Sequence, residues 1–168
     1  MALIHDPEAW QSKLAALPLE SFDAGEVVFA EGTKTGRLLI LKSGAVSIVK
    51  AGIEIAQVAE PGAVFGELLA LLDEPHGADV RTLEASEFHV ADAATLLQDP
   101  AALLYVTIVL ARRIDAANQG LLQLKILLEA GEPRSLIDKT LDGIEGLLSA
   151  IGTGYIRAGA GHSIFPSA

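Results

Sequence analysis

Six short runs rich in β-branched and other apolar residues are the feature that most constrains the fold of this chain. The runs cover residues 26–30, 38–41, 45–49, 53–58, 80–83 and 87–91. Glycines separate them, among them Gly25, Gly32, Gly44, Gly52 and Gly62, and glycine readily takes the positive φ angles that tight turns need. Short runs separated by frequent turn signals are typical of an all-β sandwich or roll.

Helical patterns lie on both sides of these runs. Residues 6–17 begin with an Asp-Pro pair and then place apolar side chains on one face, which predicts a capped helix that ends before Pro18. A second Asp-Pro pair at residues 99–100 predicts the start of a long helix that continues to about Glu129 and ends at Gly131. We therefore expect a mainly β fold with flanking helices.

The long helix carries a heptad pattern of mostly apolar residues. Its members, called the heptad row below, are Leu103, Thr107, Leu110, Ile114, Ala117, Leu121, Leu124 and Leu128. A second apolar edge widens this surface, so the helix is expected to bury two faces. Either both faces pack within the chain, or one of them is the interface of a homodimer through the 100–129 helix, which the pattern favours.

The predicted organisation has four parts. Residues 1–20 form an N-terminal helical segment, and residues 21–130 form the main domain, including the long helix. Residues 131–152 are expected to form a short amphipathic helix, interrupted by Gly143 and Gly146. The Gly- and Ala-rich residues 153–168 are expected to be a disordered tail.

Composition excludes several kinds of partner. The net charge of −10 at pH 7 argues against a nucleic-acid surface, because such surfaces need clustered Lys and Arg. There is no cysteine, which excludes disulfides and zinc–thiolate sites and is compatible with a reducing compartment. The apolar run 101–111 is too short to span a bilayer. We expect a soluble cytoplasmic protein with no nucleic-acid or membrane partner.

The segment Pro61–Val80, called the cassette below, has the character of a binding site. Its Phe65-Gly66-Glu67 corner leads into a helical turn or two, Gly66–Leu72. A helix N-terminus that is entered through glycine offers unpaired N–H groups and a positive dipole. Glu67 beside it suits a ligand with both an anion and a hydroxyl, such as a sugar phosphate, although a first-turn carboxylate also simply stabilises a helix N-terminus.

The cassette reads Phe-Gly-Glu-Leu, then Leu-Leu, then Pro-x-x-Ala-x-Val. At this spacing it resembles the phosphate-binding cassette of cyclic-nucleotide-binding domains, which occur in the catabolite activator protein, kinase regulatory subunits and cyclic-nucleotide-gated channels. The resemblance covers roughly Phe22 to Leu128. It implies a double-stranded β-helix, a jelly-roll-like β-roll, flanked by an N-terminal helix and a long C-terminal helix. It also implies a homodimer built on the long helix.

The resemblance further implies roles for individual residues. Gly66, Leu68 and Ala78 would contact the cyclic phosphate through their backbone, and Glu67 would accept a hydrogen bond from the ribose 2′-hydroxyl. The predicted ligand-binding set is Phe65, Gly66, Glu67, Leu68, His76, Gly77 and Ala78. On the long helix, Asn118 and Gln119 are polar candidates for contacts to the base, or else ordinary exposed helix residues.

This chain departs from the family pattern at two positions. Where the family has Pro-Arg-(Ser/Thr)-Ala, the chain has Pro75-His76-Gly77-Ala78. The loss of a bidentate arginine–phosphate pair is expected to weaken binding by about ten- to several-hundred-fold. If His76 reaches the phosphate, its protonated form restores the charge, and affinity falls as pH rises through the bound-state pKa. Alternatively, His76 is a loop residue without a partner.

Three classes of function follow from these observations. The first is a regulatory domain that binds cAMP, cGMP or a related small anion. The second is a degenerate domain that serves for dimerisation or for docking an unknown protein partner. The third is a metal-dependent enzyme on a similar barrel, but the histidines His5, His76, His89 and His162 lack the spacing it needs. No nucleophile–base pair stands out either. We therefore predict no catalytic residue, no metal and no cofactor.

Overall fold

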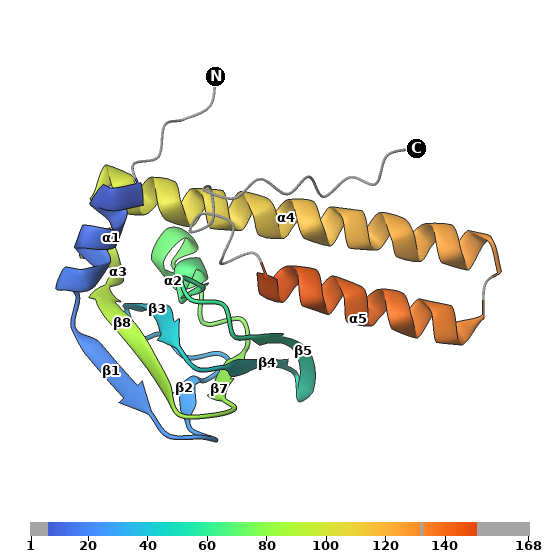
Figure 1. The fold of residues 1–168 in the computed structure, drawn as a ribbon, viewed down its shortest axis with the longest axis horizontal. Coiled ribbons are helices and arrows are strands. Elements are labelled where there is room, and N and C mark those ends of the chain that lie inside the picture. Colours follow the sequence, from blue (N-terminus) through green and yellow to red (C-terminus); the bar gives the residue numbers. More distant parts are fainter. Residues whose placement is uncertain (1–6, 132, 151–168) are drawn as a thin grey trace.

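The computed structural model describes residues 7–131 and 133–150 and combines a β-roll with a long helical hairpin (Figure 1). The elements in chain order are α1 (Pro7–Ala16), β1 (Leu19–Phe22), β2 (Val27–Phe29), β3 (Arg37–Ser43), β4 (Val46–Lys50), β5 (Ile53–Val58), β6 (Val64–Phe65), α2 (Glu67–Leu72), β7 (Asp79–Thr82), β8 (Ser86–Asp92), α3 (Ala93–Leu96), α4 (Pro100–Glu129) and α5 (Arg134–Ala150). The predicted β-roll flanked by helices is confirmed.

The roll consists of two four-stranded antiparallel sheets. Their strand orders are β1-β8-β3-β6 and β2-β7-β4-β5. Alternate side chains of each strand point between the sheets, where they form one core. Its fully or nearly fully buried members are Phe29, Leu39, Leu41, Val46, Val58, Ala63, Phe65, Val80 and Phe88. The six predicted runs became β2, β3, β4, β5, β7 and β8, because their apolar and β-branched residues suit strands that pack into a core.

A second core joins the roll to its helices. The other face of β3 contributes Leu38 and Ile40, which pack with residues from α1 and the first half of α4. Trp10 of α1 stacks on Tyr105 of α4 with ring centroids 4.5 Å apart. The Tyr105 hydroxyl donates to the Gly62 carbonyl at 2.7 Å. These contacts fix α4 against the sheet immediately beside the cassette.

The sequence pattern did not reveal three short elements. Strand β1 begins at Leu19, inside the stretch predicted as an N-terminal helical segment, and directly follows the Pro18 at which the helix was expected to end. Strand β6 has two residues, and helix α3 has four. Elements this short lack enough periodicity to be recognised. The predicted cap at Asp6 and the tail 153–168 lie outside the described residues.

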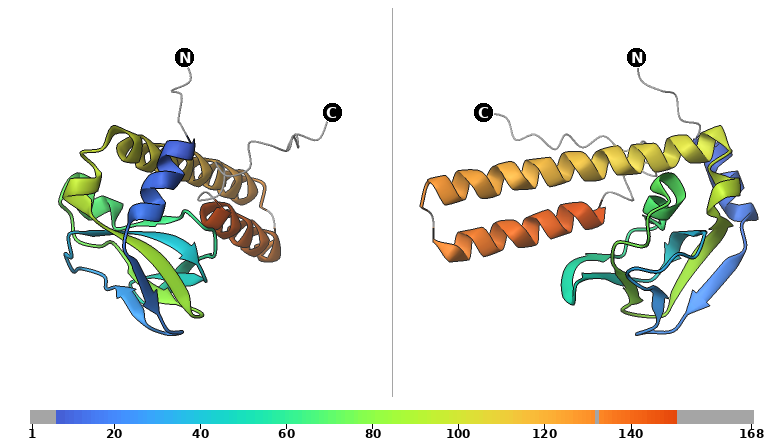
Figure 2. Two further views of the ribbon diagram at one scale, coloured as in Figure 1. Left: turned by 60° about the vertical axis from the view of Figure 1, so that its left-hand side comes forward. Right: turned by 180° about the vertical axis from the view of Figure 1, so that it is seen from behind.

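Helix boundaries were predicted well where capping residues mark them. Helix α4 begins at Pro100, and the Asp99 side chain accepts from the backbone N–H groups of Ala101 and Ala102 at 2.9 and 3.1 Å. Gly131 follows its end with a φ of 68°, a left-handed conformation that glycine adopts at helix ends. Helix α5 then returns antiparallel beside α4 towards β5 (Figure 1, Figure 2).

The distal half of α4 keeps much of its apolar surface exposed. In the heptad row, Ile114, Leu121 and Leu128 are 62%, 65% and 65% exposed. The buried residues of α4 lie on another face, from Ala102 to Gly120. The alternative in which both apolar faces pack within the chain is therefore wrong for the described residues.

None of the helices within residues 7–131 and 133–150 combines the length and the hydrophobicity of a membrane span.

Candidate functional site

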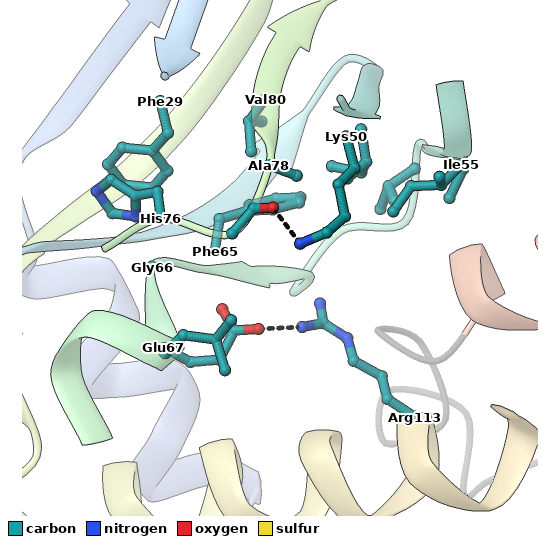
Figure 3. Close-up of a pocket in the computed structure, with 15 residues that line it drawn as sticks. Phe29, Lys50, Ile55, Phe65, Gly66, Glu67, His76, Ala78, Val80 and Arg113 are labelled. Atoms are coloured by element: carbon teal, nitrogen blue, oxygen red, sulfur yellow. Dashed lines mark hydrogen bonds and ion pairs between the residues drawn. The ribbon is translucent and has the colours of Figure 1, made fainter. Parts of the chain in front are cut away.

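A cavity of about 320 Å³ lies between the cassette, the sheet that contains β4 and β5, and helix α4 (Figure 3). It is lined by Phe29, Ile48, Lys50, Ile55, Ala56, Val58, Phe65, Gly66, Glu67, Leu68, His76, Gly77, Ala78, Val80 and Arg113. All seven predicted cassette residues are among them. The lining is mostly apolar with a few charged groups, which is typical of a small-molecule site.

Gly66 sets the geometry of the cassette corner. Its φ is +92°, a region that side chains of L-residues rarely enter. A Cβ atom at this position would also lie 2.5 Å from the Arg37 carbonyl oxygen, so the sheet leaves no room for one. The chain turns here from β6 into α2, as predicted, and this turn places the side chain of Glu67 at the cavity wall (Figure 3).

Glu67 forms an ion pair with Arg113 of α4. Glu67 Oε1 accepts from Arg113 Nη1 at 2.7 Å, and the two side chains are only 14% and 26% exposed. Arg113 Nη2 also donates to the Val64 carbonyl at 2.8 Å. A carboxylate accepts up to about four hydrogen bonds, so Glu67 retains capacity for a ligand hydroxyl. In the sequence, Arg113 only marked the end of an apolar run, and its role at the site was not predicted.

His76 is buried at the cavity wall and is only 5% exposed. Its ring stacks on Phe29 with centroids 4.0 Å apart, and its Nε2 atom lies 2.9 Å from the Thr35 hydroxyl. The alternative of a loop residue without a partner is therefore wrong. Burial lowers the pKa of His76, although the Glu67 carboxylate acts in the opposite direction, and a lowered pKa favours the neutral imidazole.

Lys50 brings a further charge to the cavity. It is the last residue of β4, and its Nζ atom donates to the Gly77 carbonyl at 2.7 Å. Figure 3 shows Lys50 and Arg113 pointing towards each other, with Glu67 beside Arg113. Lys50 was not predicted, since a lysine before a hairpin turn gives no sign in the sequence that it will reach the cassette.

Comparison with known proteins identifies the domain that holds this cavity. Residues 19–98 match the family model of the cyclic nucleotide-binding domain. This stretch belongs to the cyclic nucleotide-binding domain family. A cAMP-dependent protein kinase regulatory subunit of Yarrowia lipolytica is 35% identical over 75 residues, which make up 45% of this chain and 20% of the relative. The match thus spans about a fifth of that regulatory subunit.

Solved structures share the fold of this cyclic nucleotide-binding domain. The catabolite activator protein of Thermus thermophilus aligns with a TM-score of 0.59 at 20% identity, over 84% of each chain. The cAMP-bound PfPKA-R fragment aligns with a TM-score of 0.56 at 21% identity, over 79% of this chain and 43% of the fragment. At these identities the likeness concerns the fold alone.

Two predicted contacts lie away from the cavity. Asn118 and Gln119 are exposed on α4 and are not among the lining residues. Gln119 Nε2 donates to Asp115 Oδ2 at 2.8 Å, one turn earlier on the same helix. The structure thus brings the cassette residues together but leaves these two apart.

Among the described residues, no cluster of His, Asp and Glu is arranged to hold a metal ion.

Proposed function

We propose that this chain is a non-catalytic regulatory domain that binds a cyclic nucleotide, cAMP or cGMP, in the cassette cavity. The observation that carries the proposal is the nearly buried Glu67 carboxylate, placed by the Gly66 corner at the wall of an otherwise mostly apolar cavity. An acceptor in such a place suits a sugar hydroxyl, and the apolar walls suit a base. The match to the cyclic nucleotide-binding family supports the same ligand class.

The proposed contacts follow from the geometry of the cassette. Backbone groups of Gly66, Leu68 and Ala78 would hold the cyclic phosphate, and Glu67 would accept from the 2′-hydroxyl. His76 contributes no fixed charge, because it is stacked and hydrogen-bonded inside the wall and its pKa is lowered by burial. We therefore infer that binding is weaker than a cassette arginine would allow.

Calorimetric titration with cAMP and with cGMP tests this function. We expect a saturable heat with the wild-type protein, and an affinity about ten- to a hundred-fold lower in Glu67→Gln, which removes a charged acceptor. Glu87→Gln is the matched control. Glu87 forms an ion pair with Lys42, with 2.8 Å between Oε2 and Nζ, and neither residue lines the cavity. Absence of any saturable heat from a wild-type protein shown to be folded by circular dichroism would contradict the function.

The exposed heptad row favours a second candidate, a module for dimerisation or protein docking that binds no nucleotide. Ile114, Leu121 and Leu128 form an apolar surface that no described part of the chain covers. A homodimer through α4 is compatible with either function, and an unknown protein partner would receive the output. We propose a cytoplasmic location for both, in keeping with the absence of cysteine.

A further inference from the structure

We propose that Lys50 supplies the positive charge that binds the anionic group of the ligand in this cavity. The proposal rests on the function proposed above and deepens it, since it names the side chain that pairs with the phosphate. Lys50 lies at the end of β4, outside the cassette but on the cavity wall that faces it. The anion site would thus be completed from a different part of the roll.

The distribution of charge in the cavity favours Lys50. The lining contains Lys50, Glu67, His76 and Arg113 as its ionisable side chains. Glu67 and Arg113 neutralise each other, and His76 is already hydrogen-bonded and has its pKa lowered by burial. Lys50 takes part in none of the ion pairs among residues 7–131 and 133–150. It is therefore the lining cation whose charge remains available to a ligand.

The ammonium group of Lys50 lies beside the position where a side chain at Gly77 would begin. A Cβ atom built on Gly77 would lie 3.7 Å from Lys50 Nζ and 3.4 Å from Leu68 Cδ1. The family pattern has a hydroxyl donor at the position of Gly77, and that position opens here onto the ammonium group. Lys50 thus reaches the cassette at a position where this chain departs from the family pattern.

Two carboxylates adjoin the residues before and after Lys50 in the chain, and neither forms an ion pair with Lys50. Asp79 stands opposite Val49 in the β4–β7 register and accepts from the Glu31 backbone N–H at 2.6 Å. The Glu31 carboxylate in turn accepts from the Ala51 backbone N–H at 2.9 Å. Both carboxylates accept hydrogen bonds from backbone N–H groups instead. The ammonium group of Lys50 therefore remains available to pair with a ligand.

Exchange of the present acceptor for an anion is favourable. The ammonium group now donates to a neutral carbonyl, that of Gly77, at 2.7 Å. That bond already has a charged donor, and an anionic acceptor adds the Coulomb attraction between two opposite charges. The flexible four-carbon stem of lysine allows Nζ to follow the ligand. The half-buried Gly77 can exchange its bond for one to water, so little is lost when the ammonium group moves.

Calorimetry with cAMP and with neutral adenosine tests the role of Lys50. In Lys50→Met we expect the affinity for cAMP to fall about ten- to a hundred-fold, while the affinity for adenosine stays unchanged. Lys50→Arg should retain most of the affinity for cAMP, because it keeps the charge. Lys42→Met is the matched control, since Lys42 pairs with Glu87 on the other sheet, and it should bind both ligands like the wild type.

The outcomes separate this proposal from the proposed function. Equal cAMP affinities of Lys50→Met and the wild type would overturn the role of Lys50, and so would an equal loss for cAMP and adenosine. If the wild type binds neither cAMP nor cGMP, the proposed function fails. In that case, a titration with inorganic phosphate followed by NMR tests whether Lys50 binds an anion. Shifts confined to Lys50 and Gly77 would support the anion site, whereas equal shifts at Lys50 and Lys42 would overturn it.

Discussion

At the scale of single residues, two histidines with lowered pKa values shape how this domain responds to pH. Burial lowers the pKa of His76, against an opposing effect of Glu67. Burial and the nearby Lys42 likewise lower the pKa of His89, against the effect of Glu87. A histidine whose folded pKa lies below its unfolded value costs stability as pH falls, because the unfolded chain binds the proton first.

The first prediction is that His76→Gln reduces the loss of stability on acidification. In the wild type, the contribution of neutral His76 to the free energy of unfolding should be complete above the unfolded-state pKa of histidine, about 6.5. This contribution should decrease as pH falls from there through the lowered pKa of the folded state. Urea unfolding at several pH values between about 5 and 8 measures the free energy of unfolding. The carboxylates with lowered pKa, such as Asp92 and Asp99, act below this window. A variant with the same pH slope as the wild type would contradict the burial argument.

The second prediction concerns ligand affinity. From the sequence, a falling affinity with rising pH was expected if His76 reaches the phosphate. In the structure its Nε2 faces the Thr35 hydroxyl and its pKa is lowered from about 6.5, so the neutral ring is favoured throughout the interval from pH 7 to 8. Affinities for cAMP at those two pH values should agree to within about twofold. A tenfold decline measured by calorimetry would show that imidazolium contacts the ligand.

The cassette was predictable from sequence because its parts lie close together in the chain. The Gly66 corner, the helical turn after it and Glu67 follow one another directly in the sequence. The side chains that complete the cavity come from far away: Arg113 is 46 positions from Glu67, Thr35 is 41 from His76, and Lys50 is 27 from Gly77. Such contacts depend on how the sheets close, and local pattern carries no information on that.

At the scale of elements, the β6–α2 junction depends on one glycine. Gly66 combines a φ of +92° with an approach to the Arg37 carbonyl that excludes a Cβ atom. Gly52, in the β4–β5 turn, has a comparable φ of +78°, but a Cβ atom there would meet no atom of the described residues within 4 Å. A comparison of substitutions at the two positions therefore distinguishes the free-energy cost of backbone strain from that of a steric clash.

The third prediction compares Gly66→Ala with Gly52→Ala. The strain of a left-handed alanine costs roughly 1–2 kcal/mol, which should be the whole effect in Gly52→Ala. Gly66→Ala should lose clearly more, because β3 or the corner must also move away. Urea unfolding of both variants gives the difference directly. Equal losses would show that the corner relaxes without cost, and a smaller loss at Gly66 would contradict the close approach.

At the scale of the whole molecule, α4 and α5 form a hairpin that extends beyond the roll (Figure 2). Its outer surface carries Leu121 and Leu128, each 65% exposed. Exposed apolar rows of this regularity are characteristic of helix–helix interfaces. Leu124, in the same row, is half-buried, so substitution there would also disturb the single chain.

The fourth prediction is that the wild type is a dimer in solution and that Leu121→Glu makes it monomeric. A charge in the centre of an apolar interface is costly to bury, but it costs the exposed surface of a monomer little. Gln123→Glu adds the same charge on another exposed part of α4 and should remain dimeric. Light scattering measures the mass against the 17.5 kDa of one chain. A wild type that is monomeric at about 100 µM would rule out the dimer.

The Arg113–Glu67 ion pair joins the cavity to the helix that carries the heptad row. Arg113 and Ile114 are adjacent on α4, one facing the cavity and the other exposed. A ligand that binds Glu67 therefore acts, through Arg113, on the same helix that a second copy of the chain would contact. Thermodynamic linkage makes such an effect reciprocal: the factor by which nucleotide changes the dimerisation constant is also the factor by which dimerisation changes nucleotide affinity.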